Sequence, residues 1–99
     1  MAKTVKTYHW SDIVSTNDTE TKLTLPVLRK LNIMNTGQYP VEFEIDNAIE
    51  VGRSIVLPVN VSYPAGPGVL DIRYRTAPAH TGEASQLTLA GLKQTKDLN

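Results

Sequence analysis

The side chains that most often carry chemistry are few and scattered in this sequence. The two histidines, His9 and His80, lie near opposite ends of the chain, and neither has a neighbouring His, Cys or Glu at a metal-binding spacing. A zinc site needs three or four such ligands, so we expect both histidines to be surface or capping residues. The sequence predicts no metal site.

The other familiar catalytic patterns do not occur. Asp12, Asp18 and Glu20 lack the Asp-x-Asp-x-Asp-Gly spacing that wraps calcium, and we interpret them as residues of a solvated turn. There is no G-x-S-x-G nucleophile motif, no glycine-rich phosphate loop ahead of a helix and no cysteine. We therefore expect a protein that is not an enzyme and that needs no cofactor.

The one patterned charge feature is a pair of rows. Glu42, Glu44 and Asp46 alternate along one segment, and Arg73 and Arg75 alternate along another. In an immunoglobulin-type sandwich these two segments are neighbouring strands. Two interpretations follow: a charge ladder on the solvent face of one copy, or a contact in which the acidic row of one copy meets the basic row of the next.

Tyr8 and Trp10 complete the set of candidate interface residues. Aromatic side chains with a polar tip are enriched where proteins meet. The alternative is that both rings cover the open edge of the core. The polar ends of the chain, residues 1–4 and 93–99, are interpreted as arms that reach onto neighbouring molecules or as tails.

Composition sets the class of protein. The 99 residues form one domain, 1–99, and the ten basic and ten acidic residues cancel. No global field draws the chain to nucleic acid or to an anionic membrane, so we expect neither as a partner. The N-terminal residues contain no apolar stretch, so we expect a soluble protein without a signal peptide.

Strict alternation between Leu31 and Asp46 predicts the strands around which the chain is organised. Leu31 and Ile33 point to one side of the first strand, and Val41, Phe43 and Ile45 point to one side of the second. The acidic row then faces water. The turn Asn35-Thr36-Gly37 consists of residues that tolerate positive φ.

The rest of the chain reads as short strands and turns. We expect an edge strand over 3–14 and a turn over 15–22. Pro26 then interrupts the alternation of Leu23 and Leu25, which marks an edge strand or a strand that changes sheet. Further segments are a loop or short strand at 47–53, a continuous edge strand at 54–63, a tight turn at 64–68, a strand at 69–76 with Leu70, Ile72 and Tyr74 inward, a polar loop at 76–85 and a last strand at 86–92. No segment has a helical period.

About seven short strands predict an all-β fold, an Ig-like antiparallel β-sandwich. An OB-like or SH3-like barrel is the alternative. We prefer the sandwich because the strands are numerous and the turns contain no insertion of helical length.

A family resemblance follows from the last two-thirds of the chain. The pattern is an I-x-N-T-G-x-x-P-V-x-F-x-I strand pair, a Pro-Gly-rich turn before a Leu-x-Ile-x-Tyr strand, and a Gly-containing loop before a Leu-x-Leu strand. It resembles the Ig-like domains of the hydin and major sperm protein superfamily, often called ASH domains. The matching residues are Ile33, Asn35, Thr36, Gly37, Pro40, Val41, Phe43, Ile45, Pro64, Gly66, Leu70, Ile72, Tyr74, Pro78, Gly82, Leu87 and Leu89.

The resemblance implies a sandwich used for binding or assembly and supplies no catalytic residue. The sequence departs from the family at Tyr74 to Pro78, where the aromatic residue and the proline lie further apart than usual. Together with the absence of chemistry, it leads us to expect a structural protein of a phage virion, such as a capsid decoration protein or a tail or connector subunit. Its partners are then other subunits, itself included, in a homo-oligomer or in many copies.

Two alternatives remain open at this point. One is an Ig-like adaptor in the cytoplasm that binds a protein or peptide along a sheet edge. The other, which needs a pocket or a basic face, is an enzyme or an RNA-binding barrel.

Overall fold

The protein folds into two packed antiparallel sheets. The structure is a computed structural model that describes residues 4–46 and 54–97, with side chains for 8–46 and 54–93. Its strands are β1 (Thr4–Thr16), β2 (Thr21–Thr24), β3 (Leu28–Asn35), β4 (Val41–Ile45), β5 (Ile55–Leu57), β6 (Ser62–Ala65), β7 (Asp71–Thr76) and β8 (Ser85–Asp97), with a 3₁₀ turn at Pro78–His80. The described part of the chain contains no helix long and apolar enough to cross a membrane.

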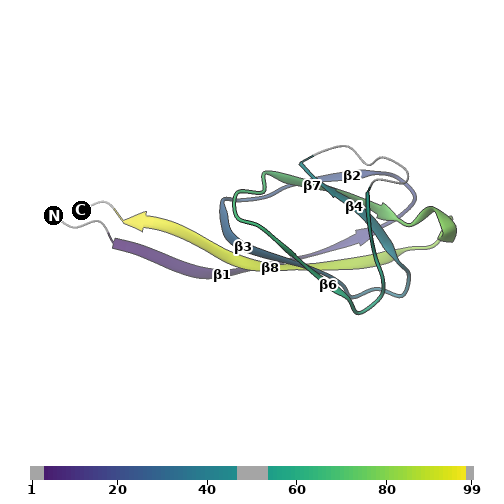
Figure 1. Cartoon of the computed structure of the whole chain (residues 1–99), viewed down its shortest axis with the longest axis horizontal. Helices are drawn as coiled ribbons and strands as arrows, with labels where there is room; N and C mark the ends of the chain where they lie inside the picture. Colours follow the sequence, from purple (N-terminus) through teal and green to yellow (C-terminus); the bar gives the residue numbers. More distant parts are fainter. Residues whose placement is uncertain (1–3, 47–53, 98–99) are drawn as a thin grey trace.

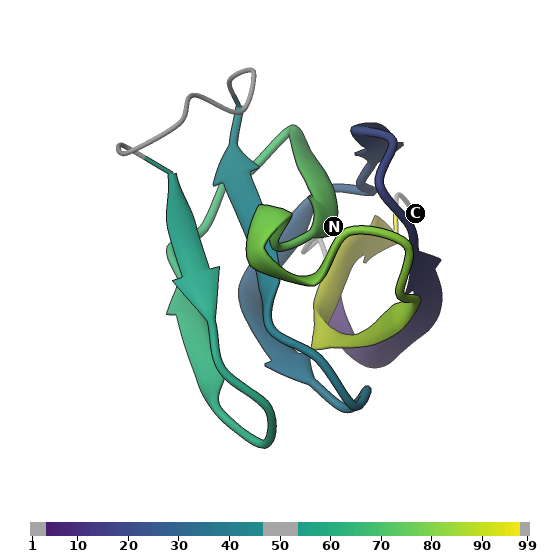
Figure 2. The ribbon, with the colours of Figure 1, turned by 90° about the vertical axis from the view of Figure 1, so that its right-hand side faces the viewer.

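The topology is that of one long hairpin rolled up on itself. Sheet A has the strand order β1-β8-β3-β6, and sheet B has the order β2-β7-β4-β5. Counting inward from the two ends, β1 pairs with β8, β2 with β7, β3 with β6 and β4 with β5. Rolling brings β3 beside β8 and β4 beside β7, which gives the eight-stranded double sheet of a jelly roll (Figures 1 and 2).

The predicted fold class, an all-β antiparallel sandwich, is confirmed. The described residues form eight strands where about seven were expected, and β1 and β8 are long, at 13 residues each. The strand order also differs in detail from the seven-strand immunoglobulin arrangement, because the first and last strands are neighbours here.

Alternation builds the core between the two sheets. Leu31 and Ile33 of β3 are buried while Asn32 and Met34 face outward, and the same period continues on β7 with Ile72 and Tyr74. The buried hydrophobic cluster contains Leu25, Leu28, Leu31, Ile33, Val41, Phe43, Leu57, Val69, Ile72, Tyr74, Leu87 and Leu89. Side chains from both sheets interdigitate in it, as they must in a sandwich.

A buried carboxamide joins four parts of the chain. Asn35, the last residue of β3, is fully buried. Its Nδ2 donates to the Tyr39 carbonyl at 2.8 Å and to the Leu57 carbonyl at 2.9 Å, while its Oδ1 accepts from the Gly37 amide at 2.9 Å and from the Ser85 hydroxyl at 3.4 Å. One side chain therefore fixes the β3–β4 turn, the end of β5 and the start of β8.

The turn after β3 works differently from the prediction. In the described residues, positive φ occurs at Asp46, Asn60, Gly68 and Gly82, and none of these lies in Asn35-Thr36-Gly37. Gly37 is required for another reason. A Cβ there would collide with the Ser85 side chain and the Gln86 backbone. Glycine lets this turn lie directly against the first residues of β8.

The single strand predicted over 54–63 is wrong. The segment forms β5 in sheet B and β6 in sheet A, and the chain crosses between the sheets through Pro58 to Val61. Asn60 adopts φ 64°, and its amide donates to the Asn35 carbonyl at 2.9 Å. Proline followed by a left-handed residue ends the ladder, although β5 and β6 are both edge strands as expected.

Other expectations differ at the ends of strands. Leu70 was expected inside but is 69% exposed, since the chain enters β7 only at Asp71 and Val69 is buried instead. β2 begins at Thr21 within the predicted turn, β6 takes in Pro64 and Ala65, and β8 runs on to Asp97. Pro26 ends a strand before a change of sheet, as predicted. The segment 47–53 lies outside the described residues.

The Asn35 network gives a stability prediction. Asn35→Ala removes the side-chain partner of the Leu57 carbonyl and of the Gly37 amide, whereas the Tyr39 carbonyl keeps the Ser85 hydroxyl. We therefore expect it to lower the free energy of unfolding by about 2 kcal/mol or more. Asn32→Ala, an exposed position on the same strand, is the control and should change it by less than about 0.5 kcal/mol. Urea unfolding followed by circular dichroism measures both; equal effects would contradict the role of the network.

Candidate functional site

The acidic and basic rows lie on the outer side of sheet B, where β4 and β7 pair. Their register sets Glu42 opposite Arg75 and Glu44 opposite Arg73. Glu42 is not in water as predicted: it is only 4% exposed. Its Oε1 accepts from Arg75 Nε at 2.7 Å and lies 2.6 Å from Arg75 Nη2. The guanidinium both neutralises and covers the carboxylate, which is what allows this acid to be buried.

The second pair of the predicted ladder has different partners. Arg73 Nη1 lies 3.4 Å from Glu20 Oε2, in the segment just before β2. Glu44 Oε1 accepts from the amide of Ile45 at 3.3 Å. Lys22 of β2 lies 3.8 Å from Asp71 of β7 and adds a further ion pair on this face. The charges of this face thus pair across three strands within one copy.

Asp46 does not extend the acidic row. It adopts φ 57° at the end of β4, and its Oδ1 accepts from the amides of Leu70 and Asp71 at 2.8 and 3.0 Å. The side chain fastens the end of β4 to the start of β7. Its position explains its residue type, because Asp tolerates a left-handed backbone and bonds nearby amides.

Tyr8 and Trp10 lie on β1, the edge strand of sheet A. Trp10 packs against the core cluster from the edge, whereas Tyr8 is 48% exposed. The two rings therefore differ: one covers the open side of the core, as one interpretation of the sequence predicted, and the other remains available to a partner.

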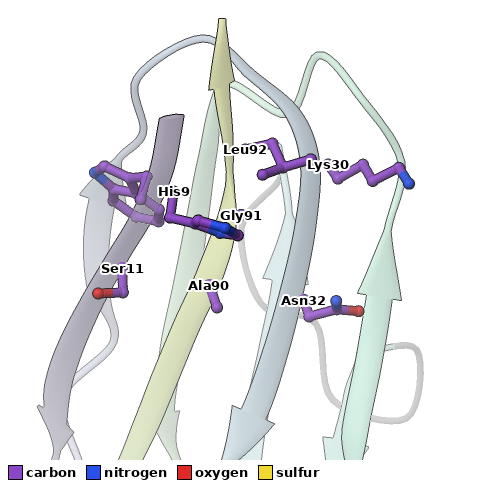
Figure 3. Close-up of a pocket in the computed structure, with 8 residues that line it drawn as sticks. His9, Ser11, Lys30, Asn32, Ala90, Gly91 and Leu92 are labelled. Carbon is purple, nitrogen blue, oxygen red and sulfur yellow. The ribbon is translucent and has the colours of Figure 1, made fainter. Parts of the chain in front are cut away.

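A hollow of about 410 Å³ lies beside Trp10 on sheet A. Ala90 and Gly91 of the middle strand form its floor, with His9 and Ser11 of β1 on one side and Lys30 and Asn32 of β3 on the other (Figure 3). Gly91 is required here because a Cβ would meet the Lys30 carbonyl, at the irregularity where the β3–β8 register shifts. The small side chains of Ala90 and Gly91 leave this recess open.

The outer face of sheet A carries little charge. Cross-strand rows on it include Ile13, Thr88, Met34 and Ser62; Ser11, Ala90, Asn32 and Pro64; and His9, Leu92 and Lys30. Among these residues Lys30 is the one Lys, Arg, Asp or Glu. This surface contrasts with sheet B, where acidic and basic side chains pair.

The strands β1 and β8 continue beyond the sandwich as a two-stranded ribbon. β3 follows β8 as far as the pair Leu28–Lys93, whereas β1 follows it to the pair Thr4–Asp97. Residues 4–7 and 94–97 thus pair with each other, and no third strand of the described part of the chain pairs with them (Figure 1). Most of the residues predicted as a C-terminal arm form this ribbon, while residues 1–3 and 98–99 lie outside the described part.

Comparison of the chain with protein-family models, with curated proteins and with solved structures finds no match. The resemblance to ASH domains stays a prediction. In the described residues no group of three or more His, Cys, Asp or Glu side chains is placed to hold a metal ion.

The hollow and the ribbon were missed from sequence. The available signal for the hollow was Ala90-Gly91, two small residues within a predicted strand, since glycine in a strand often marks close backbone approach.

The buried ion pair predicts a large asymmetry between two arginines. Arg75→Met leaves the Glu42 carboxylate buried without its partner, so we expect the free energy of unfolding to fall by about 2–3 kcal/mol. Arg73→Met removes a longer and more exposed pair and should cost less than about 1 kcal/mol. In a double-mutant cycle, adding Glu42→Gln to Arg75→Met should recover part of the loss; strict additivity would contradict the pairing.

Tyr74 predicts how stability changes at alkaline pH. Burial raises the pKa of Tyr74 above its usual 10.0, and the nearby charge of Asp12 adds to the shift. The unfolded chain then loses the phenolic proton at a lower pH than the folded chain, so stability should fall as the pH rises above about 10. Tyr74→Phe should make this decline shallower in urea melts between pH 9 and 11. An unchanged decline would show that Tyr74 does not contribute.

Proposed function

We propose that the protein is a non-enzymatic structural subunit that joins copies of itself or other subunits in a large assembly, a phage virion in particular. The observation that carries the proposal is the β1–β8 ribbon beyond β3. An isolated two-stranded ribbon is marginally stable in water, and within the described ranges no third strand pairs with this one. Contact with a neighbouring molecule supplies that cover.

Two further features support assembly. The outer face of sheet A has little charge and contains the hollow, and Ile13 on it is 62% exposed. Eight-stranded jelly rolls are also a frequent architecture of viral capsid proteins, although the fold hosts lectins and cupins as well. The fold is an analogy that favours the virion, and the ribbon is the physical argument.

The sequence left open a contact between the acidic row of one copy and the basic row of the next, and this proposal does not depend on that contact. Arg75 and Glu42 pair within the chain, so they are not free to meet the rows of a second copy. The pair Arg75–Glu42 should therefore add no salt dependence to assembly. The cytoplasmic adaptor remains the second candidate, and what favours it is the long unpaired edge of β1, along which an extended peptide fits.

Light scattering combined with hydrogen exchange tests the proposal. We expect a mass above that of the monomer at low and at high salt, with amides of residues 4–7 and 94–97 becoming slower to exchange as protein concentration rises. The physical reason is that the ribbon gains its cover only from a neighbour. A strict monomer whose ribbon amides are already protected in dilute solution would overturn the proposal.

A further inference from the structure

The free edge of β1 is the longest open sheet edge in the described residues. The sandwich has four edge strands: β1 with 13 residues, β2 and β6 with 4 each, and β5 with 3. Short strands expose few backbone groups, and Pro64 within β6 removes a donor there. β1 contains no proline. Its edge is the one that can accept another strand over a useful length.

The register shows which residues of β1 direct their backbone groups to this edge. Gln86 pairs with Ser15, yet its carbonyl accepts from Thr36 on the opposite side. The backbone groups of Gln86 therefore point away from β1. In an antiparallel ladder, two opposite residues either bond each other or both direct their backbone groups away from each other. The backbone groups of Ser15 therefore point to the free edge. Alternation extends this to His9, Ser11 and Ile13.

Asp12 confirms this assignment independently. Its Oδ1 accepts from the Ile13 amide at 2.9 Å, which this amide would not do if it were bonded to β8. The carboxylate occupies a donor that an incoming strand also needs. Such a side chain on an edge strand limits indiscriminate pairing, and a suitable partner must draw the carboxylate away.

We propose that β1 pairs antiparallel with β1 of a second copy, about a twofold axis at His9, and so joins two A sheets into one. The proposal rests on the proposed assembly function and names one of its contacts. In this register Tyr8 lies opposite Trp10 of the second copy, and Lys6 lies opposite Asp12. Each match occurs twice, as a twofold axis requires.

The pattern of β1 favours this register over its neighbours. Two other axes keep the same backbone pairing. An axis at Trp10 sets Lys6 opposite Val14 and Asp12 opposite Tyr8. An axis at Ser11 sets Lys6 opposite Thr16 and Asp12 opposite Trp10. With the axis at His9, the aromatic and the charged matches fall in non-hydrogen-bonded pairs, in which side chains approach most closely. At this register the sequence sets a basic residue, Lys6, opposite the acidic Asp12.

A second copy fits this edge better than an unrelated peptide. The two ionic and two aromatic matches arise from β1 alone, so the edge is complementary to itself. Both residues that the sequence singled out on this strand, Tyr8 and Trp10, would then contribute to one contact.

Cysteine substitution tests the axis directly, because the chain contains no cysteine. His9→Cys places two thiols opposite each other on the axis, at a Cα separation of about 5.5 Å that a disulfide can bridge. Ser11→Cys, equally exposed, places its two thiols about 13 Å apart along the strands. We expect His9→Cys to form a covalent dimer under mild oxidation and Ser11→Cys not to. Equal cross-linking of both, or of neither, would overturn the proposal.

Charge reversal provides a second measurement without a cross-link. Lys6→Glu sets two carboxylates opposite each other twice in the pair, so we expect the dissociation constant from light scattering to rise about tenfold. Lys93→Glu, which makes the same change in net charge on β8, should leave it within about twofold. Equal effects of the two would count against the register.

The two proposals fail in different ways. If wild-type protein assembles but His9→Cys does not cross-link, the β1 contact is wrong and the assembly function stands. If wild-type protein is a strict monomer with protected ribbon amides, both are wrong.

Discussion

The buried amide of Asn35 is the constraint on which the rest of the sandwich depends. It is a polar group without access to water, and it bonds the β3–β4 turn, the end of β5 and the start of β8. A slip of β3 by one residue would place this amide in solvent and leave its partners unsatisfied, at a cost of about 1–3 kcal/mol for each group. The hydrophobic residues drive the sheets together, and Asn35 determines how they meet.

Local alternation accounts for what could be predicted from the sequence. Leu31, Ile33, Phe43 and Tyr74 were placed correctly because the side chains of a strand alternate whatever the strand pairs with. The same rule could not find the break at Pro58, since Leu57 and Tyr63 keep the same parity on either side of it. Pro58 and Asn60 were the available signals, and the alternation outweighed them.

The candidate site depends on which strands and side chains lie opposite each other, and the alternation within one strand gives no information about that. Glu42 and Glu44 look identical in sequence, and each has an arginine opposite it. Arg75 pairs with Glu42, which is buried, whereas Arg73 pairs with Glu20 instead of Glu44. Residues after Lys93 looked like a tail because their side chains are polar, whereas backbone bonds to β1 hold them in β8. The charges of sheet B therefore pair within the chain and connect its strands.

The rolled-hairpin topology also affects how the chain is made. β1 emerges from the ribosome well before β8, its ladder partner among the described strands. Throughout translation β1 therefore has two open edges instead of one. Pairing between strands that are far apart in the sequence is slow, and unpaired strands are prone to aggregate before their partner strand is available.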